Sequence, residues 1–404
     1  MEDNFKDKSF CTLPFIHLAT HPIGVVTPCC ITDMKDGAST AKKNGNNLFL
    51  NEDKLEDITN SHLFNSVRKQ MINGEYPDVC KTCYRYESNQ VFSRRYESND
   101  KFKHVIDECF KNTNEDGSLK KLDYRYLELR LGTICNLKCI TCNPFSSNRW
   151  NEDVGIFKGT EFQPNYFKND VKSEWYRDPN FYDELFDKCT NLEEVWINGG
   201  EPTLIREHGY FLNKLIESGR AKNIDLHYSI NATNIPDEFI EIWKKFKSTK
   251  LQLSVDDLYE RNDYIRTGSK WDTIHENILK MTNYRHIFRI EVCQTISALN
   301  AHNVDNFKNY VFGLNLITAH NFVHHPSFLH VSHMPKELKE EILGNVKYLT
   351  KEEFKRFESE VNTEGSVENF ERFRTFISML DKKRKVSIGD SLPEWKPYFE
   401  NYNG

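Results

Sequence analysis

Residues from about 121 to 335 alternate between short apolar runs and helical stretches. The runs that resemble strands cover residues 124–131, 192–198, 224–230, 251–255, 288–295 and 319–323. The helical stretches cover residues 181–188, 208–217, 236–246, 270–283 and 303–311. Repetition of strand, helix and strand implies right-handed crossovers between parallel strands. The pattern therefore predicts an α/β core built as an open, partial barrel of six strands.

The segments on either side of this core differ from it. Residues 1–120 are rich in cysteine and are punctuated by Gly, Asn and Asp, so we expect a separate α+β module, with residues 112–117 as a linker. Residues 336–404 are highly charged and mainly helical in pattern, which indicates a C-terminal cap. The expected organisation thus has three parts, 1–120, 121–335 and 336–404.

Three cysteines follow the first predicted strand, at Cys135, Cys139 and Cys142. Thiolates this close in sequence converge when the loop curls around one soft metal centre. Structural zinc sites are closed by four ligands, commonly from two separated C-x-x-C pairs, so three thiolates favour a 4Fe-4S cluster with one open iron. The alternative is three buried thiols that pack as small hydrophobic groups.

The stretch from residue 131 to 142, Leu-Gly-Thr-Ile-Cys-Asn-Leu-Lys-Cys-Ile-Thr-Cys, resembles the signature of the radical S-adenosylmethionine (radical SAM) superfamily. The resemblance implies a (β/α)6 partial barrel of TIM type, with SAM chelated by the open iron of the cluster. It also implies reductive cleavage of SAM to a 5'-deoxyadenosyl radical that abstracts hydrogen from a substrate. Catalytic residues beyond the cluster are not identified by the sequence.

Polar groups follow the second predicted strand, where Gly199, Gly200 and Glu201 precede a proline. Ligands of parallel α/β folds bind at the carboxyl ends of the strands. Paired glycines let the backbone approach a ligand, and the carboxylate can meet an ammonium group. The segment is similar to the family's Gly-Gly-Glu motif, which implies that it holds the SAM amino group.

Later strand ends carry further candidate SAM contacts. Asn231 follows the third strand, with a helix cap as the alternative. Ser254 and Asp256 end the fourth strand and Arg266 lies downstream, a pattern similar to the family's Ser-x-Asp segment and its arginine. The resemblance implies that the first two contact the ribose and that Arg266 pairs the SAM carboxylate. A capped helix with a surface salt bridge is the alternative.

The fifth and sixth strand ends give weaker signals, at residues 295–300 and 323–326. His324 and His325 could approach the adenine or line a substrate pocket. A histidine pair could also bind metal, but the sequence offers no third ligand at suitable spacing. We expect an ordinary turn before Pro326.

A second cysteine group precedes the core: Cys11, the pair Cys29 and Cys30, and the C-x-x-C of Cys80 and Cys83. A zinc ribbon is one interpretation of four such thiolates. Beside the core motif, the group resembles the twitch or SPASM modules that ligate auxiliary iron-sulfur clusters. The G-x4-C spacing from Gly24 selects Cys29, so Cys11, Cys29, Cys80 and Cys83 are the expected ligands.

This module departs from the resembled pattern in two ways. It precedes the core, whereas such modules usually follow it, and Glu87 stands where a further cysteine would support a second auxiliary cluster. We therefore expect one auxiliary cluster, of 4Fe-4S type. Four thiolates would close it for electron transfer, whereas an open iron could bind substrate, and Cys30 leaves both possibilities open.

Composition and charge limit the expected partners and cellular location of the protein. The 404 residues include 54 basic and 60 acidic residues, a net charge of −6, so no nucleic-acid partner is expected. The basic run of residues 382–385 is interpreted as a solvated helix end. No apolar stretch is long enough for a membrane span or a signal peptide, so we expect a soluble, cytoplasmic protein whose eleven cysteines serve metal rather than disulfides.

Three functions remain open. The first is a radical SAM enzyme that acts on a peptide or protein side chain, reduced by a flavodoxin-type or ferredoxin-type donor. The second is a radical SAM dehydrogenase or cyclase that acts on a small molecule or nucleotide. The third is a non-catalytic zinc or iron-sulfur protein, which would have no affinity for SAM.

Overall fold

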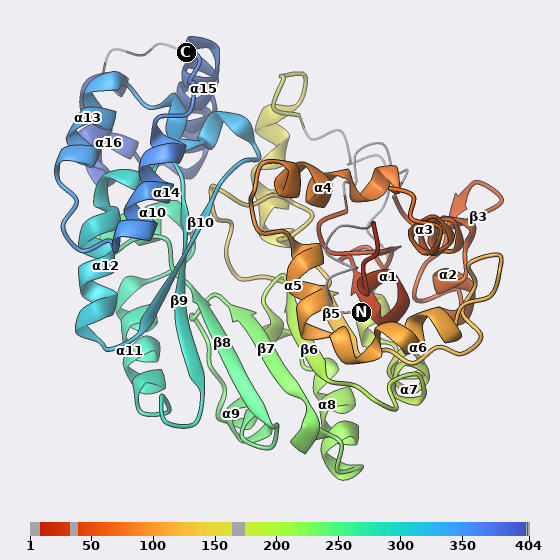
Figure 1. Ribbon diagram of the computed structural model, residues 1–404. Helices are drawn as coiled ribbons and strands as arrows, with labels where there is room; N and C mark the ends of the chain where they lie inside the picture. Colours follow the sequence, from red (N-terminus) through yellow and green to blue (C-terminus); the bar gives the residue numbers. More distant parts are fainter. Residues whose placement is uncertain (1–8, 33–38, 164–173, 401, 403–404) are drawn as a thin grey trace. The chain divides into compact units, whose positions relative to one another are not determined.

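The computed structural model describes residues 9–32, 39–163, 174–400 and 402, and its main sheet runs through the whole core (Figure 1). Its strands are β1 (His17–Thr20), β2 (Val26–Thr27), β5 (Tyr126–Leu131), β6 (Glu194–Gly199), β7 (Asp225–Ile230), β8 (Ser248–Ser254), β9 (Arg289–Ile296) and β10 (Ile317–Phe322). Hydrogen-bonded neighbours follow the order β10-β9-β8-β7-β6-β5-β1-β2. A separate hairpin pairs β3 (Lys42–Lys43) with β4 (Asn46–Asn47). The order confirms the predicted α/β class with a (β/α)6 core.

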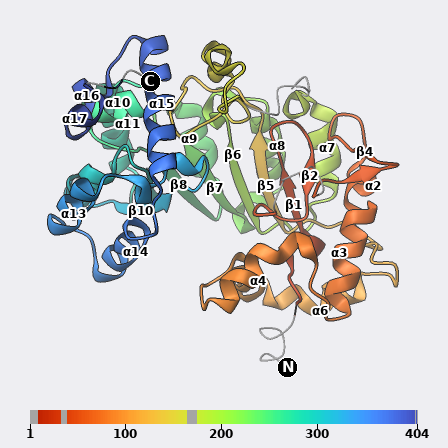
Figure 2. The same cartoon turned by 90° about the horizontal axis from the view of Figure 1, so that it is seen from above.

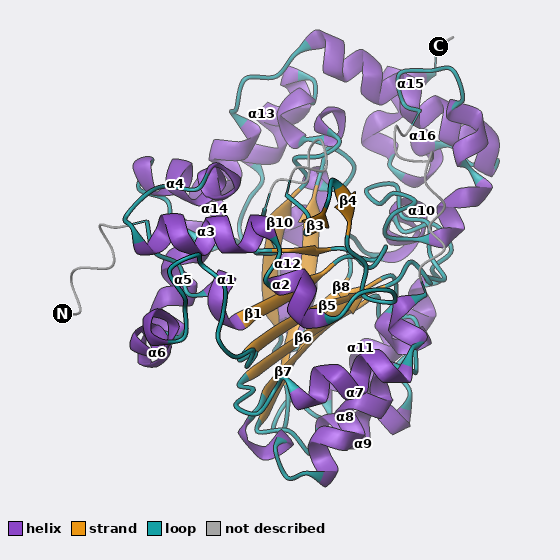
Figure 3. Ribbon diagram, turned by 90° about the vertical axis from the view of Figure 1, so that its right-hand side faces the viewer, coloured by secondary structure: helices purple, strands orange, loops and turns teal. Residues whose placement is uncertain are grey.

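Helices alternate with the core strands as the sequence predicts. They are α7 (Pro179–Asp187), α8 (His208–Glu217), α9 (Asp237–Trp243), α10 (Tyr259–Ile265), α11 (Trp271–Thr282) and α12 (Val304–Gly313). The amphipathic helices α7 and α8 pack against each other (Figure 3). Only α10 was not expected as a helix, since its seven residues carry too few apolar positions to show a period.

The chain divides into two compact units, which are described separately. The first holds residues 1–132, 171–227 and 238–248, and the second holds residues 133–170, 228–237 and 249–404. In the first unit, β1 pairs parallel with β5 and antiparallel with β2. The cysteine-rich segment thus adds strands to the core sheet. The three-part organisation expected from the sequence stays a prediction.

Helices make up most of the remaining N-terminal segment (Figure 2). They are α1 (Leu13–Ile16), α2 (Leu55–Thr59), α3 (His62–Ile72), α4 (Lys81–Ser88), α5 (Arg94–Lys101) and α6 (Ile106–Lys111). The expectation of a linker at residues 112–117 is wrong. Arg68, fully buried, donates from Nε to the Gly117 carbonyl at 2.7 Å and from Nη1 to the Pro14 carbonyl at 3.0 Å. Buried guanidinium donors fix this turn in place, because leaving them unpaired would be costly.

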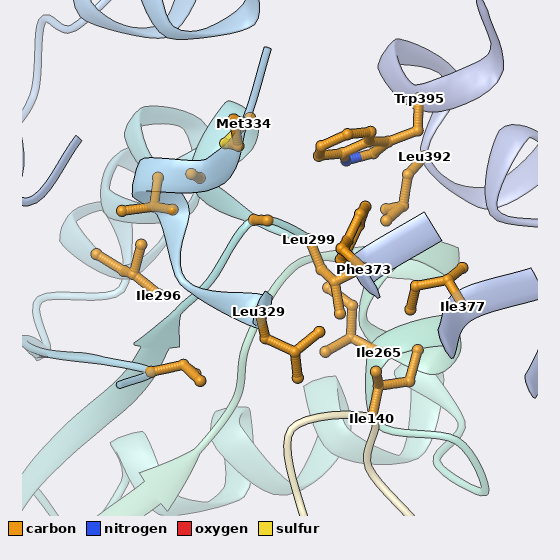
Figure 4. Packing of buried hydrophobic residues seen from close by; sticks show 14 of the residues in the cluster. Ile140, Ile265, Ile296, Leu299, Leu329, Met334, Phe373, Ile377, Leu392 and Trp395 are labelled. Atoms are coloured by element: carbon orange, nitrogen blue, oxygen red, sulfur yellow. The ribbon is translucent and has the colours of Figure 1, made fainter. Parts of the chain in front are cut away.

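The C-terminal helices belong to the core of the second unit. They are α13 (Lys336–Gly344), α14 (Lys351–Val361), α15 (Val367–Arg384), α16 (Ile388–Ser391) and α17 (Lys396–Phe399). Phe373, Ile377 and Trp395 share one buried cluster with Ile140 of the cysteine loop (Figure 4). Each such side chain contributes about 1.5–3 kcal/mol by leaving water. The C-terminal segment therefore stabilises the loop that carries Cys139.

Candidate functional site

The cysteine loop follows β5 and lies within the second unit. Cys139 is buried, whereas Cys135 and Cys142 are partly exposed. Two backbone hydrogen bonds tie the loop to the segment after α10, from Lys138 N–H to the Thr267 carbonyl at 2.9 Å and from Ile140 N–H to the Ile265 carbonyl at 2.8 Å. The Cys142 N–H donates to the Cys139 carbonyl at 3.0 Å, which closes a turn between the two thiols. The backbone therefore curls as the cysteine spacing predicts.

Side chains from the next segment hold this curl from outside. Asn148 accepts from the Cys135 N–H at 3.2 Å, and its own N–H donates to the Thr133 carbonyl at 2.7 Å. Trp150 Nε1 donates to the Cys139 carbonyl at 3.0 Å. These bonds fix the backbone around Cys135 and Cys139.

Arg384, at the end of α15, binds the same loop. Its side chain is 3% exposed and donates to Asp153 Oδ2 at 2.8 Å, to Thr267 Oγ1 at 2.9 Å and to the Lys138 carbonyl at 3.0 Å. The guanidinium also lies over the Trp150 ring, 5.1 Å from its centroid. The expectation that the whole basic run is a solvated helix end is therefore wrong at this residue, while Lys382, Lys383 and Lys385 are exposed.

Arg266 lies beside the buried thiol of the loop. Its Nη1 donates to Asp256 Oδ2 at 2.9 Å, and Asp256 Oδ1 accepts from the Thr295 N–H at 3.0 Å. Burial raises the pKa of Cys139 to about 12, and the Arg266 guanidinium opposes that rise. Burial likewise raises the pKa of Cys142 to about 11. These thiols stay protonated at neutral pH until a metal centre displaces their protons.

The surroundings of Arg266 fit an anionic ligand. Its Nε is buried and has no hydrogen-bond partner among the described residues. A buried guanidinium donor without a partner is costly, so a carboxylate or a cluster sulfide at this point would satisfy it. The backbone at Gly268 packs closely against the cysteine loop, because a Cβ there would lie 3.1 Å from the Asn136 carbonyl oxygen. The φ of Gly268 is +103°. The strand-end pair and the cysteine loop are thus brought together, as the sequence predicts for Asp256 and Arg266.

Asn231 and Ser254 lie in the same unit. Asn231 Nδ2 donates to Asn136 Oδ1 at 2.8 Å and lies 3.9 Å from Cys135 Sγ, while its Oδ1 accepts from the Thr233 N–H at 3.0 Å. This side chain therefore supports the cysteine loop, in addition to the cofactor contact predicted for it. Ser254 ends β8, opposite Cys293 of β9.

Gly199, Gly200 and Glu201 lie in the first unit, at the end of β6. Gly199 has a φ of +127°, and a Cβ there would stand 2.3 Å from the Leu131 carbonyl oxygen. Glu201 is 1% exposed and accepts from the Thr203 N–H at 3.1 Å and from Thr203 Oγ1 at 2.6 Å. Gly199 thus allows a close approach between β5 and β6, and the hydrogen bonds from Thr203 hold the Glu201 carboxylate in one orientation. A SAM contact for these residues stays a prediction.

Four cysteines of the first unit line one cavity: Cys11, Cys29, Cys80 and Cys83. They come from the loop before α1, the end of the β1–β2 hairpin, and the start of α4. Burial raises the pKa of Cys80 to about 12 and raises that of Cys11 further. Four thiol groups around one hollow are the donor set of a closed iron-sulfur or zinc site.

Cys30 does not line this cavity. The neighbouring Cys29 side chain and burial strongly raise the pKa of its thiol. The placement supports the choice of Cys29 over Cys30.

Arg95 also lines the cavity, and the sequence did not single it out. It pairs with Glu87, donating from Nε to Oε1 at 3.0 Å, and from Nη1 to the Phe10 carbonyl at 3.1 Å. Its charge opposes the rise in pKa of Cys11, Cys80 and Cys83. Glu87 stands where a cysteine would be expected for a second auxiliary cluster, and here its carboxylate positions the Arg95 guanidinium beside the thiols. Only the tertiary fold reveals this pair.

Two family models match the chain where these thiols lie. One, described as radical SAM superfamily, matches residues 129–329, and the other, an iron-sulfur cluster-binding domain called SPASM, matches residues 11–84. Cys135, Cys139 and Cys142 fall in the first match, and the cavity cysteines fall in the second. The chain belongs to the radical SAM superfamily.

The SPASM match places an iron-sulfur cluster-binding domain ahead of the radical SAM core. Radical SAM proteins bind a 4Fe-4S cluster and SAM, and the three cysteines of the loop fit that cluster. No curated protein matches the chain significantly. None of the described helices is long and apolar enough to cross a membrane.

Solved structures of two proteins match more loosely. His-tagged anSMEcpe with bound AdoMet is 16% identical, with a TM-score of 0.37, and the match covers 55% of this chain and 58% of that one. Streptococcus suis SuiB bound to S-adenosylmethionine is 16% identical, with a TM-score of 0.35, covering 85% of this chain and 67% of that one. Such scores describe poor overall superpositions, so the family assignment rests on the family models and the cysteines.

Proposed function

We propose that this radical SAM enzyme modifies a side chain of a peptide or protein, with its auxiliary cluster taking up an electron from the substrate. The observation that carries the proposal is the gathering of Cys11, Cys29, Cys80 and Cys83 around one cavity. Four thiolates leave no iron open, so a cluster there would carry electrons rather than bind substrate. The SPASM match supports a peptide substrate, because many resembled enzymes with accessory clusters act on peptides.

Different residues of the core are assigned to the cluster and to SAM. When bound, SAM and its cluster supply a 5'-deoxyadenosyl radical that takes hydrogen from the substrate. Cys135, Cys139 and Cys142 would hold that cluster, and Arg266, whose Nε has no partner among the described residues, would orient the SAM carboxylate. Asn231, Ser254 and Asp256 would contact SAM from the ends of their own strands, and Glu201, with Gly199 and Gly200, would meet the SAM amino group, as the family resemblance implies. A flavodoxin-type or ferredoxin-type donor and a cytoplasmic location complete the proposal.

The substrate class can be tested with the reconstituted enzyme. Anaerobic enzyme with SAM and dithionite is incubated with a pool of random peptides or, as the matched arm, with a pool of nucleosides and sugars. We expect the peptide pool alone to stimulate 5'-deoxyadenosine release and to yield peptides of altered mass. Stimulation by the small-molecule pool alone would contradict the proposal and favour a small-molecule dehydrogenase or cyclase.

A further inference from the structure

Three metal-binding side chains of the second unit meet beyond the end of β10. They are His324, His330 and Glu360, and their ligand atoms all lie within 4.8 Å of one another. His324 comes two residues after β10, His330 lies between two short 3-10 turns, and Glu360 lies in the last turn of α14. The sequence offered His324 no third ligand at suitable spacing. The fold brings His330 and Glu360 to His324, and His325 does not belong to the trio.

The spacing within this trio fits a metal ion. Ligands at 2.0–2.1 Å from a tetrahedral zinc lie about 3.3 Å apart. His330 Nε2 and Glu360 Oε2 are separated by 3.2 Å, which matches that edge. The rings of His324 and His330 stack with centroids 5.2 Å apart and planes at 22°. The ligand atoms lie within 4.8 Å of one another, so the exposed His324 side chain would have to move by about 1–2 Å to bring all three onto one ion.

Ser332 orients the His330 ring, as an outer hydrogen-bond partner usually orients a metal-binding histidine. The Nδ1 atom lies 2.9 Å from Ser332 Oγ and 3.2 Å from the Ser332 nitrogen. Without metal, Nδ1 accepts from the Ser332 N–H and Nε2 donates to Glu360. With metal on Nε2, the proton moves to Nδ1 and is donated to Ser332 Oγ, the outer hydrogen bond typical of metal-bound histidine.

The electrostatics of the trio also favour a cation. Glu360 places a negative charge at the C-terminal end of α14, where the helix dipole is itself negative and the last turn holds no basic residue. Lys339 is a cation near His330 and acts against binding.

His333 is close but already engaged. Its Nδ1 accepts from the Ser366 N–H at 3.0 Å, and its Nε2 lies 3.2 Å from Asn369 Nδ2. It therefore holds α15 rather than an ion. The ligand set is two imidazoles and one carboxylate, which leaves a coordination position for water or a substrate group.

We propose that His324, His330 and Glu360 bind one divalent transition-metal ion, with zinc as the best match to this ligand set. The site uses no cysteine and is separate from both thiol groups. It is independent of the proposed peptide substrate. Its place at the carboxyl end of β10, the edge at which parallel α/β folds bind ligands, allows the open position to receive a polar group of a substrate.

The test uses the holoenzyme with its clusters reconstituted, so that cysteines are not available to zinc. One equivalent of Zn²⁺ is added anaerobically, the protein is desalted, and bound zinc is counted by mass spectrometry. We expect about one zinc per chain for the wild type and for His325→Ala, the matched neighbour. His324→Ala and Glu360→Gln should bind zinc at least about 100-fold more weakly, since even outer-shell changes cost 10–100-fold.

X-ray absorption at the zinc edge then identifies the ligands. We expect nitrogen and oxygen at about 2.0–2.1 Å with imidazole scattering, and no sulfur at about 2.3 Å. His324 is exposed, so its variant should fold, and circular dichroism checks this. Equal zinc in the wild type and His324→Ala, or sulfur in the zinc shell, would overturn the proposal.

Discussion

At the scale of single residues, Arg384 connects the C-terminal helix α15 to the cysteine loop. Its three hydrogen-bonded partners, Asp153, Thr267 and the Lys138 carbonyl, all support that loop. Removing it leaves the buried Asp153 carboxylate with Lys138 as its one remaining cation. Arg384 therefore has a structural role that could not be inferred from its position in the basic run of residues 382–385.

We expect Arg384→Met to destabilise the protein by about 3 kcal/mol, the lower end of the cost of breaking a buried ion pair. The iron retained on the core cluster after desalting should also fall. Lys383→Met is the matched control, because Lys383 is exposed on the same turn. Urea unfolding and iron analysis measure both effects. Similar midpoints and iron contents for the two variants would show that Arg384 does not support the loop.

The buried imidazole of His208 makes the stability of the protein depend on pH. It is fully buried at the start of α8, stacked on Phe239, and burial lowers its pKa to about 4. Its folded pKa lies below the unfolded value of about 6.5, so the stability it contributes is complete above pH 6.5 and falls as the pH drops toward 4. At pH 5 the loss should be about 2 kcal/mol.

Histidine-labelled NMR tests this directly by following the ring of His208 from pH 7 to pH 5. We expect the ring to remain neutral, and His208→Gln to flatten the fall in stability over that range. His62→Gln, at an exposed position, is the control and should change neither. A ring that titrates near pH 6.5 would contradict the burial argument.

At the scale of elements, the end of β6 depends on Gly199. A Cβ there would overlap the Leu131 backbone of β5, and its φ of +127° suits no other residue well. We expect Gly199→Ala to destabilise the protein by about 2 kcal/mol or more and to weaken SAM binding. Gly209→Ala in α8, where a Cβ meets nothing within 4 Å, should be neutral or stabilising by about 0.5–1 kcal/mol. Thermal unfolding and equilibrium dialysis of SAM compare the two, and equal behaviour would contradict this role.

The C-terminal helices are a second element-scale feature. Trp395 is fully buried, and its ring lies 4.8 Å from that of Phe373 in the cluster that includes Ile140. We expect Trp395→Ala to cost about 3–5 kcal/mol, whereas Val367→Ala, at a position 80% exposed on α15, should cost little. Urea unfolding measures both. If the tryptophan variant unfolded at the wild-type midpoint, the C-terminal segment would be an independent cap.

At the scale of the whole molecule, local patterns predicted more of the fold than of the contacts. The six core strands follow from runs of apolar residues, because a buried parallel strand is readable from its own sequence. The cysteine spacings also indicated that Cys11, Cys29, Cys80 and Cys83 would lie together, and these four line one cavity. Their role as ligands stays a prediction. Arg95, Arg384 and the trio at His324 could not be predicted, since their partners come from distant elements and their sequence context is ordinary. The N-terminal helices and α10 were obscured by polar, charged composition.

The central claim is that two separate thiol groups hold two clusters with different tasks. The most direct measurement is iron content together with 5'-deoxyadenosine release after anaerobic reconstitution, for the wild type and two multiple variants. We predict about eight irons per chain in the wild type, for two 4Fe-4S clusters. Replacing Cys135, Cys139 and Cys142 with Ala should remove about half of the iron and all SAM cleavage. Replacing Cys80 and Cys83 should remove the other half but spare cleavage. A protein that holds zinc alone, or equal loss of cleavage in both variants, would contradict the account.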